Sequence, residues 1–280
     1  MTEILLCSDL DRTLLPNGVQ PESPEARPIF RTLARHQNLT LAYVSGRDKS
    51  LLLEAIHDYD LPVPDFAVGD VGTTIYEIHG DQWCPLQAWA EEIATDWAGR
   101  DHNDLASLFQ DIDSLTLQEP EKQNTFKLSY YAPTETDRNA LLAEMNTRLD
   151  HVGVQASVIW SIDEAKAVGL LDVLPRHATK YHAIRFLMER KGFDEGNTVF
   201  AGDSGNDLPV LTSGLQAVLV HNARSEVREE ALRIVQEKEV EKRLFIARGD
   251  FLGMNGNYAA GVLEGLVHFR PEALRWLGRD

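Results

Sequence analysis

The sequence predicts an α/β protein whose core is a parallel sheet and which carries a second, inserted α/β domain. Near both ends of the chain, apolar runs typical of buried parallel strands alternate with segments of helical periodicity. The middle of the chain instead shows the period-two alternation of an antiparallel sheet with one open face. Acidic and small polar residues follow several apolar runs, and open α/β sheets place their ligand sites at such strand ends. We therefore expect one core made from both ends of the chain, with a ligand site at one edge of its sheet.

The first third of the chain alternates strands with helices, which implies parallel neighbours joined by right-handed crossovers. We expect strands at residues 4–7, 39–44, 66–68 and 74–78, and helices at residues 25–36 and 49–59. Long apolar runs become fewer from about residue 82. We therefore assign residues 1–81 to the first part of the core.

The middle block, residues 82–170, is predicted to be the inserted domain. We expect helices at residues 86–97, 104–112 and 136–149, and strands at residues 126–132, 154–160 and 167–174. Thr136 is placed to cap the third of these helices. The strand–helix pattern then returns, with helices at residues 180–191, 208–213, 225–238 and from 258, and strands at 198–201, 217–220 and 244–247. Residues 171–280 are therefore assigned to the second part of the core.

The charge of the chain limits the class of partner. The 27 Lys and Arg residues face 44 Asp and Glu residues, which gives a formal net charge of −17. This balance argues against nucleic acid or an anionic membrane surface as partner, and an anionic substrate would need local cations. Cys7 and Cys84 form no disulfide or zinc-site pattern, and Cys7 is expected to be buried. No leader or membrane-spanning segment is visible, so a cytoplasmic protein is expected.

Two carboxylates, Asp9 and Asp11, follow the first predicted strand. In an extended segment, residues two apart point the same way, so both can face one small volume. Like charges that close need a cation or a shared proton. The alternative is that the two residues only cap or form a turn.

A second acidic cluster lies at residues 202–207, again after a buried strand. Asp203 and Asp207 are four residues apart and fall on one face if a helix starts there. Carboxylate oxygens are the ligands that Mg²⁺ requires. The alternative is a turn that caps the helix beginning at Leu208.

Two further segments supply positive charge or hydrogen-bond donors. Ser45, Gly46 and Arg47 follow the second strand at a helix start, which is a ready anion site, although a helix cap explains them equally well. Lys180 begins a helix, where the helix dipole disfavours a cation. Its position therefore suggests a further role, although most lysines are simply solvated.

Together and in this order, these segments resemble the haloacid dehalogenase superfamily of phosphohydrolases, with its DxDxT, Ser/Thr-Gly, Lys and GDxxxD elements. The resemblance covers nearly the whole chain and implies a Rossmann-like core with an inserted α/β cap domain of the Cof-like branch, which sets substrate specificity. The closest resemblance is to the sucrose-phosphate phosphatases. It is carried by residues 45–47, 171–180, 202–207 and 261–269.

The resemblance implies a covalent mechanism and assigns roles to the residues above. Asp9 is implied as the nucleophile and Asp11 as the general acid and base. The implied Mg²⁺ site comprises Asp9, Asp11 through its carbonyl, Asp203 and Asp207. The implied phosphate ligands are Ser45, Gly46, Arg47, Lys180 and Asn206.

The implied reaction is hydrolysis of a small-molecule sugar phosphate, with sucrose 6-phosphate expected first. Mannosylfructose phosphate and hexose phosphates are alternative substrates. A phosphotransferase or mutase, and a non-catalytic partner of a sugar-phosphate synthase, are alternative functions; a functional association with such a synthase is also expected.

Arg12 either reaches the substrate or solvates the mouth of the site. The loop at residues 248–257 differs from that of sucrose-phosphate phosphatases. Four tryptophans are assigned to the cap, where stacking on a sugar face is one alternative and burial in hydrophobic packing is expected for most of them: Trp83, Trp89, Trp97 and Trp160.

Overall fold

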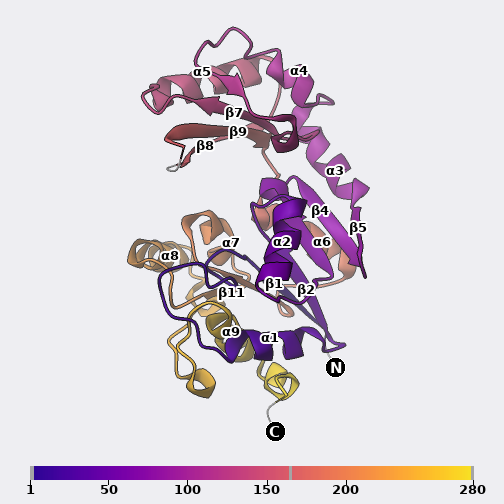
Figure 1. The fold of residues 1–280 in the computed structure, drawn as a ribbon, viewed down its shortest axis with the longest axis vertical. Coiled ribbons are helices and arrows are strands. Elements are labelled where there is room, and N and C mark those ends of the chain that lie inside the picture. Colours follow the sequence, from indigo (N-terminus) through magenta and orange to yellow (C-terminus); the bar gives the residue numbers. More distant parts are fainter. Residues whose placement is uncertain (1–2, 164–165, 279–280) are drawn as a thin grey trace. The chain divides into compact units, whose positions relative to one another are not determined.

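In a computed structural model, which describes residues 3–163 and 166–278, the chain forms two compact units (Figure 1). The core unit consists of Met1–Pro85 and Lys180–Asp280, and the inserted unit of Leu86–Thr179. These bounds differ from the predicted insertion at residues 82–170 for two physical reasons. The strand β5, Gln82–Pro85, pairs with the core sheet, and β9, Val168–Pro175, lies wholly in the sheet of the inserted unit.

The core unit is built on an eight-stranded sheet with the order β12-β11-β10-β1-β2-β3-β4-β5. The parallel strands are β1 (Ile4–Ser8), β2 (Leu39–Val44), β3 (Phe66–Gly69), β10 (Thr198–Gly202), β11 (Gln216–Leu219) and β12 (Leu244–Ile246). The strands β4 (Thr74–His79) and β5 are antiparallel additions at one edge. The predicted parallel core is confirmed.

The central position of β1 follows from its residues. All five are buried, and Leu6 pairs with Val199 of β10 on one side and with Leu41 of β2 on the other. The chain continues from β1 to β2 and β3 in one direction, while β10, β11 and β12 extend in the other. The carboxyl ends of β1 and β10 therefore flank the point where the strand order reverses, which is where open α/β sheets bind ligands.

Six helices cover this sheet in the described part of the core unit. They are α1 (Ala26–Ala34), α2 (Lys49–Asp58), α6 (Lys180–Lys191), α7 (Leu208–Leu211), α8 (Ser225–Glu237) and α9 (Ala259–Phe269). Helix α9 is the most deeply buried of them and packs against β11 and α1. Gly265 permits this approach, because a Cβ atom there would lie 2.3 Å from Cγ2 of Val218.

The inserted unit has a four-stranded antiparallel sheet with the order β6-β7-β9-β8. Its other strands are β6 (Thr116–Leu117), β7 (Leu128–Ala132) and β8 (Ala156–Asp163), and its helices are α3 (Gln87–Ala94), α4 (His102–Ala106) and α5 (Arg138–His151). Within this unit, α4 and α5 lie on the same face of the sheet (Figure 1). The cap of α5 is Asp137, which accepts a hydrogen bond from the amide of Ala140, and not Thr136 as the sequence suggested.

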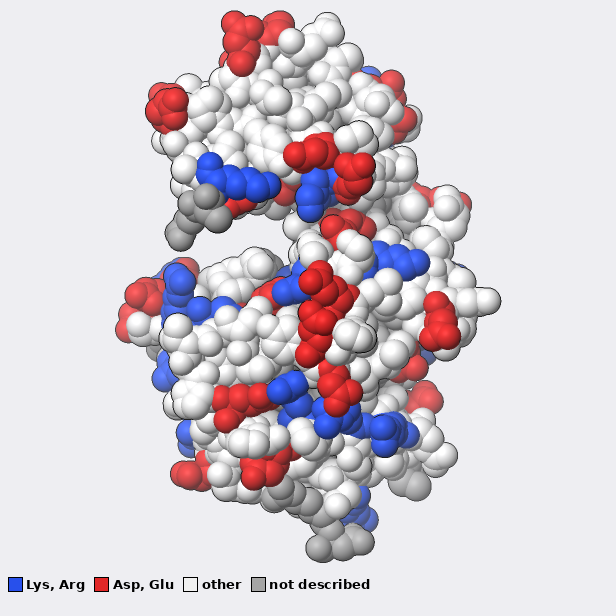
Figure 2. Space-filling model, viewed as in Figure 1, with Lys and Arg blue, Asp and Glu red and all other residues white. Residues whose placement is uncertain are grey.

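Several expectations about burial are met. Trp89 and Trp97 are buried in the inserted unit, whereas Trp83 is buried in β5 of the core unit and Trp160 is only partly buried. Cys7 is buried and Cys84 is exposed. On the face shown in Figure 2, acidic and basic side chains are interspersed over both units. Among the described residues, no helix combines the length and apolar character needed to cross a bilayer.

Candidate active site

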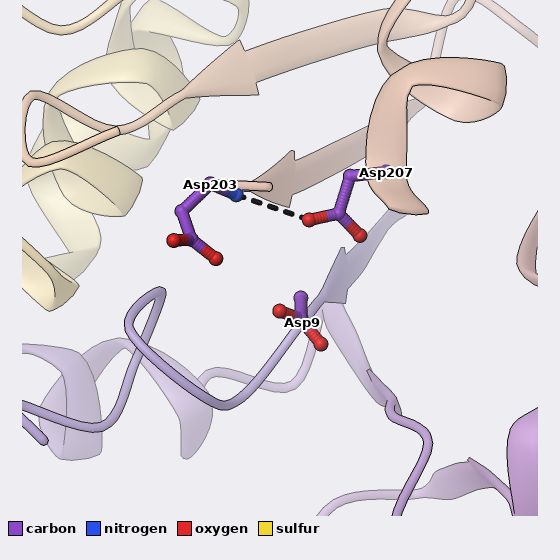
Figure 3. A group of neighbouring side chains, drawn as sticks. All are labelled: Asp9, Asp203 and Asp207. Atoms are coloured by element: carbon purple, nitrogen blue, oxygen red, sulfur yellow. Dashed lines mark hydrogen bonds between the residues drawn. The ribbon is translucent and has the colours of Figure 1, made fainter. Parts of the chain in front are cut away.

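Three carboxylates meet at the carboxyl ends of β1 and β10. The amide of Asp9 donates to the carbonyl of Ala201 at 2.9 Å, which continues the pairing of the two strands up to the site. Asp203 and Asp207 follow β10 directly. One oxygen from each carboxylate lies within 4.8 Å of the other two, and all three residues are buried (Figure 3).

Lys180 holds this cluster together from the first turn of α6. Its Nζ donates to Oδ1 of Asp9 at 2.9 Å and to Oδ1 of Asp207 at 2.7 Å, and it lies 3.4 Å from Oδ1 of Asn206. The two carboxylates offset the unfavourable position of the cation at a helix start. Lys180 is therefore a largely buried ion-pair partner of two carboxylates and not a solvated lysine.

Asp207 caps its own turn and also contacts Lys180. Its Oδ2 accepts a hydrogen bond from the amide of Asp203 at 3.1 Å (Figure 3). The same oxygen accepts a second hydrogen bond from the amide of Ser204, also at 3.1 Å. Gly202 makes room for this arrangement, because a Cβ atom there would lie 2.7 Å from Cγ of Asp207. One oxygen of Asp207 therefore caps the turn, and the other pairs with Lys180.

Asp11 has different partners from Asp9. Arg47 donates from Nε to Oδ2 at 2.8 Å and from Nη2 to Oδ1 at 2.7 Å, and Asn17 donates to Oδ1 at 2.7 Å. This paired geometry is the strong form of the arginine–carboxylate contact. The carboxylate of Asp11 is therefore fixed in direction although its side chain is 43% exposed.

The segment of Ser45, Gly46 and Arg47 does not cap α2. Asp48 does so, by accepting a hydrogen bond from the amide of Leu51 at 3.0 Å. Ser45 is buried, and its Oγ accepts from the amide of Arg47 at 3.2 Å. All three residues line a cavity of about 510 Å³. The lining also includes Asp9, Asp11, Arg12, Asp203, Asn206 and Arg224.

Arg12 neither stands free at the mouth nor points away from the acids. Its Nε donates to Oδ2 of Asp203 at 3.2 Å, and its Nη2 lies 3.4 Å from the carbonyl of Asn222. Its backbone is held on both sides, by Oδ1 of Asn17 and by Nδ2 of Asn222. Arg12 is therefore an ion-pair partner of the acidic cluster in this structure.

Burial and charge shift the pKa values of these groups in opposite directions. Burial raises the pKa of Asp9 to about 7, and the charge and hydrogen bond of Lys180 only partly offset this. Burial and the neighbouring Asp207 raise the pKa of Asp203 to about 6. Burial acts against ionisation of Asp11 as well, but the hydrogen bonds and charge of Arg47 outweigh it and hold its pKa below the usual value.

The three buried carboxylates could bind a metal. The raised pKa values of Asp9 and Asp203 show that the site favours additional positive charge. Hard oxygen donors from carboxylates are what divalent cations such as Mg²⁺ take in proteins. The donors present at Asp9, Asp203 and Asp207 thus fit a divalent cation of this kind.

Some residues of this site were not expected from the sequence. Asn17 contacts both Asp11 and the backbone of Arg12, and Asn222 joins Arg12 to the amide of Tyr258 at 2.8 Å. Neither asparagine was expected to have a role in the site, because turn-forming asparagines are common. Thr13 was part of the DxDxT pattern, and its Oγ1 lies 3.4 Å from Oδ1 of Asp203.

Comparison with known proteins shows the family of the chain. Residues 2–270 match the family described as sucrose-6F-phosphate phosphohydrolase. A protein of Nitrosococcus oceani named a HAD-like hydrolase is 60% identical over 280 residues, which are 99% of this chain and 75% of that protein. Mannosylfructose-phosphate phosphatase of Agrobacterium fabrum is 29% identical over 269 residues, covering 95% of this chain and 96% of that one.

Solved structures show the same fold. The structure of the sucrose-phosphatase from Synechocystis in complex with sucrose and phosphate has a TM-score of 0.69 and 24% identity, and covers 96% of this chain and 99% of that one. The chain spans 59% of the length of sucrose-phosphatase 1 of Nicotiana tabacum. Because the family match extends over nearly the whole sequence, the chain belongs to the sucrose-6F-phosphate phosphohydrolase family of the haloacid dehalogenase superfamily.

Proposed function

We propose that this protein is a Mg²⁺-dependent phosphatase that hydrolyses sucrose 6-phosphate through an aspartyl-phosphate intermediate. The observation that carries the proposal is the contrast between two carboxylates that line one cavity. Asp9 is buried beside Lys180, whereas Asp11 is partly exposed and held by Arg47. Two carboxylates in such different surroundings are suited to two different tasks.

In the first step, an oxygen of Asp9 attacks phosphorus, and the bond from phosphorus to the sugar oxygen breaks. Asp11 gives a proton to that oxygen as it leaves. In the second step, Asp11 takes a proton from water, whose oxygen attacks phosphorus and releases Asp9 and inorganic phosphate. Dividing hydrolysis into two displacements is the benefit of covalent catalysis, and proton transfer by Asp11 is worth typically ~10²–10⁴ in rate.

The other residues bind and orient the phosphoryl group. Lys180, the Ser45 hydroxyl and the Gly46 amide are the proposed ligands of its oxygens, with Arg47 and Asn206 beside them. A divalent cation held by Asp9, Asp203 and Asp207, with the Asp11 carbonyl, would neutralise charge on the phosphoryl group. Arg47 favours the ionised form of Asp11 by lowering its pKa, and the second step needs this form.

The choice of sucrose 6-phosphate is supported by the family match and by the sucrose-phosphatase from Synechocystis, which has the same fold. A second candidate is mannosylfructose phosphate, because the Agrobacterium relative named for that substrate aligns over 95% of this chain. The inserted unit is the proposed determinant of this choice. A functional association with a sugar-phosphate synthase stays a prediction.

A panel of phosphate esters tests the proposal, with phosphate release read as kcat/KM. The panel contains sucrose 6-phosphate, mannosylfructose phosphate, glucose 6-phosphate and fructose 6-phosphate, and the Asp9→Asn variant is the control for contaminating phosphatases. We expect sucrose 6-phosphate to rank first by about tenfold or more, as differences in pocket contacts typically give. A hexose phosphate ranking first would overturn the substrate but not the reaction. Transfer to added sugar alcohols in preference to water would instead show a phosphotransferase.

A further inference from the structure

Each carboxylate of the site has a cation beside it. Lys180 forms ion pairs with Asp9 and Asp207, Arg47 with Asp11, and Arg12 with Asp203. The ion pairs formed by Lys180 and by Arg47 involve residues with roles in the proposed mechanism, because both cations are proposed phosphate ligands and Asp11 is the proposed acid and base. The pair of Arg12 with Asp203 has no such assignment, although Asp203 is a proposed metal ligand.

The backbone of Arg12 adopts an unusual conformation that keeps its side chain in place. Its φ is +60°, a left-handed value that glycine and asparagine adopt more readily than arginine. The amide donates to Oδ1 of Asn17 at 2.8 Å, and the carbonyl accepts from Nδ2 of Asn222 at 2.7 Å. Asn222 is itself buried and accepts from the amide of Tyr258 at 2.8 Å. The surrounding structure therefore stabilises a conformation that directs this guanidinium to Asp203.

The ion pair occupies one oxygen of Asp203. The Nε of Arg12 lies 3.2 Å from Oδ2, while the side chain of Asp203 is 5% exposed and that of Arg12 is 30% exposed. A divalent cation bound by Asp203 would either share this carboxylate with the guanidinium of Arg12 or displace the guanidinium from it. Two positive charges a few ångströms apart in a partly buried site repel each other appreciably.

We infer that Arg12 is a positioning residue that acts through Asp203 as a built-in counter-cation of the metal site. It keeps the buried carboxylate paired while no metal is bound, and it lowers the affinity of the site for the metal. The inference rests on the proposed function only in that it takes Asp203 as a ligand of Mg²⁺. It does not depend on the substrate or on the chemical step.

Calorimetric titration of the full chain with Mg²⁺ alone, with no phosphate ester present, tests this inference. The variants are Arg12→Gln, which removes the charge, and Arg12→Lys, which retains it; both leave a residue with the same left-handed strain at this position. We expect the Kd for Mg²⁺ to fall on the order of tenfold in Arg12→Gln and to stay within about threefold of wild type in Arg12→Lys. The rise in Tm on adding Mg²⁺ should also be larger in Arg12→Gln, because at a given concentration a more tightly bound ligand stabilises the folded state more.

Arg224 offers a matched control in the same cavity. It lines the cavity, and among the described residues it forms no ion pair. We expect Arg224→Gln to change the Kd for Mg²⁺ by less than about twofold, because a charge without a close ligand contact is screened by solvent. An equal change in Arg224→Gln would overturn the inference, since the effect would then be one of general charge.

Two other results would overturn it: unchanged or weaker Mg²⁺ binding in Arg12→Gln, or no Mg²⁺ binding by any of the proteins. Failure of the proposed function gives a different pattern. Phosphate release would be absent from the ester panel while Arg12→Gln still bound Mg²⁺ more tightly than wild type. That pattern would support the role of Arg12 and reject the phosphatase activity.

Discussion

Arg47 donates hydrogen bonds to both carboxylate oxygens of Asp11, from Nε to Oδ2 at 2.8 Å and from Nη2 to Oδ1 at 2.7 Å. The two residues lie 36 positions apart in the sequence, at the ends of neighbouring strands β1 and β2. A carboxylate that must exchange a proton with a substrate atom works only when its lone pairs point correctly. Arg47 therefore has a proposed role in orienting Asp11 as well as in binding phosphate.

Replacing Arg47 should lower kcat. We expect Arg47→Ala to lose roughly 10²-fold in kcat, the lower end of what general acid–base catalysis contributes. Arg47→Lys keeps the charge but not the two parallel hydrogen bonds, so it should recover only part of the loss. Steady-state kinetics with sucrose 6-phosphate measure both effects, and a kcat within twofold of wild type in Arg47→Ala would show that Asp11 does not need this partner.

Asp9→Asn should abolish phosphate release without unfolding the protein. Asparagine has nearly the same size, but its amide cannot form the acyl-phosphate bond, so we expect at least a ~10³-fold loss of kcat. Because the ionised form of Asp9 is disfavoured by burial, the Tm of the metal-free variant should match or exceed that of wild type. Thermal unfolding in EDTA is the check on the fold. Wild-type turnover in this variant would reject Asp9 as the nucleophile.

Chelation of divalent cations should stop turnover, and added Mg²⁺ should restore it. The same treatment should lower the Tm of the wild-type protein, because bound metal stabilises the folded state by an amount set by its affinity and concentration. Asp203→Asn provides the control, since removing a proposed ligand should remove most of the Tm response to Mg²⁺. Full activity in excess EDTA would contradict the metal requirement.

Glu77 should contribute stability that depends on pH. Its carboxylate lies 2.7 Å from Nζ of Lys191, and this hydrogen bond, with the charge of Lys191, lowers its pKa below the usual value of 4.5. A lowered folded-state pKa means that the contribution is present above pH ~4.5 and is lost as pH falls through the folded value. For a partly exposed pair we expect Glu77→Gln to lower the free energy of unfolding by about 0.5–1 kcal/mol at pH 7.

Urea unfolding of wild type and Glu77→Gln at pH 7 and at successively lower pH measures this contribution. The difference between the two proteins should shrink as the medium becomes more acidic. A difference that persists unchanged at low pH would assign the effect of Glu77 to packing instead of charge. The Lys191→Met variant, combined with Glu77→Gln in a double-mutant cycle, isolates the pairwise part.

The two cysteines should differ sharply in reactivity. Burial raises the pKa of the Cys7 thiol far above its usual range, whereas Cys84 is exposed in β5. A disulfide reagent should therefore modify one thiol quickly in the folded protein and the second only after unfolding. Cys84→Ser should leave the folded protein unreactive. Rapid modification of that variant would mean that β1 opens readily.

The sequence was informative where residue type and local pattern determine structure. The apolar run at β1 and the lysine at the start of α6 both stood out, because a buried strand and a misplaced cation have local signatures. The end of the insertion was harder to locate, since β9 is an apolar strand that suits either sheet by its residues alone. The two-residue strand β6 is too short to have a period.

The contacts among side chains from distant segments could not be predicted. Arg12 and Asp203 lie 191 positions apart, and nothing in either segment specifies their pairing. Asn222 is one asparagine in a turn, and its contacts with Arg12 depend on the register of β11 within the sheet. Such contacts depend on the assembled backbone and therefore required the structure.

The position of β1 between β2 and β10 also affects the order in which contacts can form while the ribosome synthesises the chain. Lys180 and Asp9 are 171 positions apart, with the whole inserted unit encoded between them. During synthesis, Asp9 at the end of β1 therefore cannot pair with Lys180 until most of the chain has been translated. Long-range pairing of this kind slows folding, because loop closure precedes any gain from the contact. The cluster of Asp9, Asp203 and Asp207 can therefore assemble only after residue 207 has been synthesised.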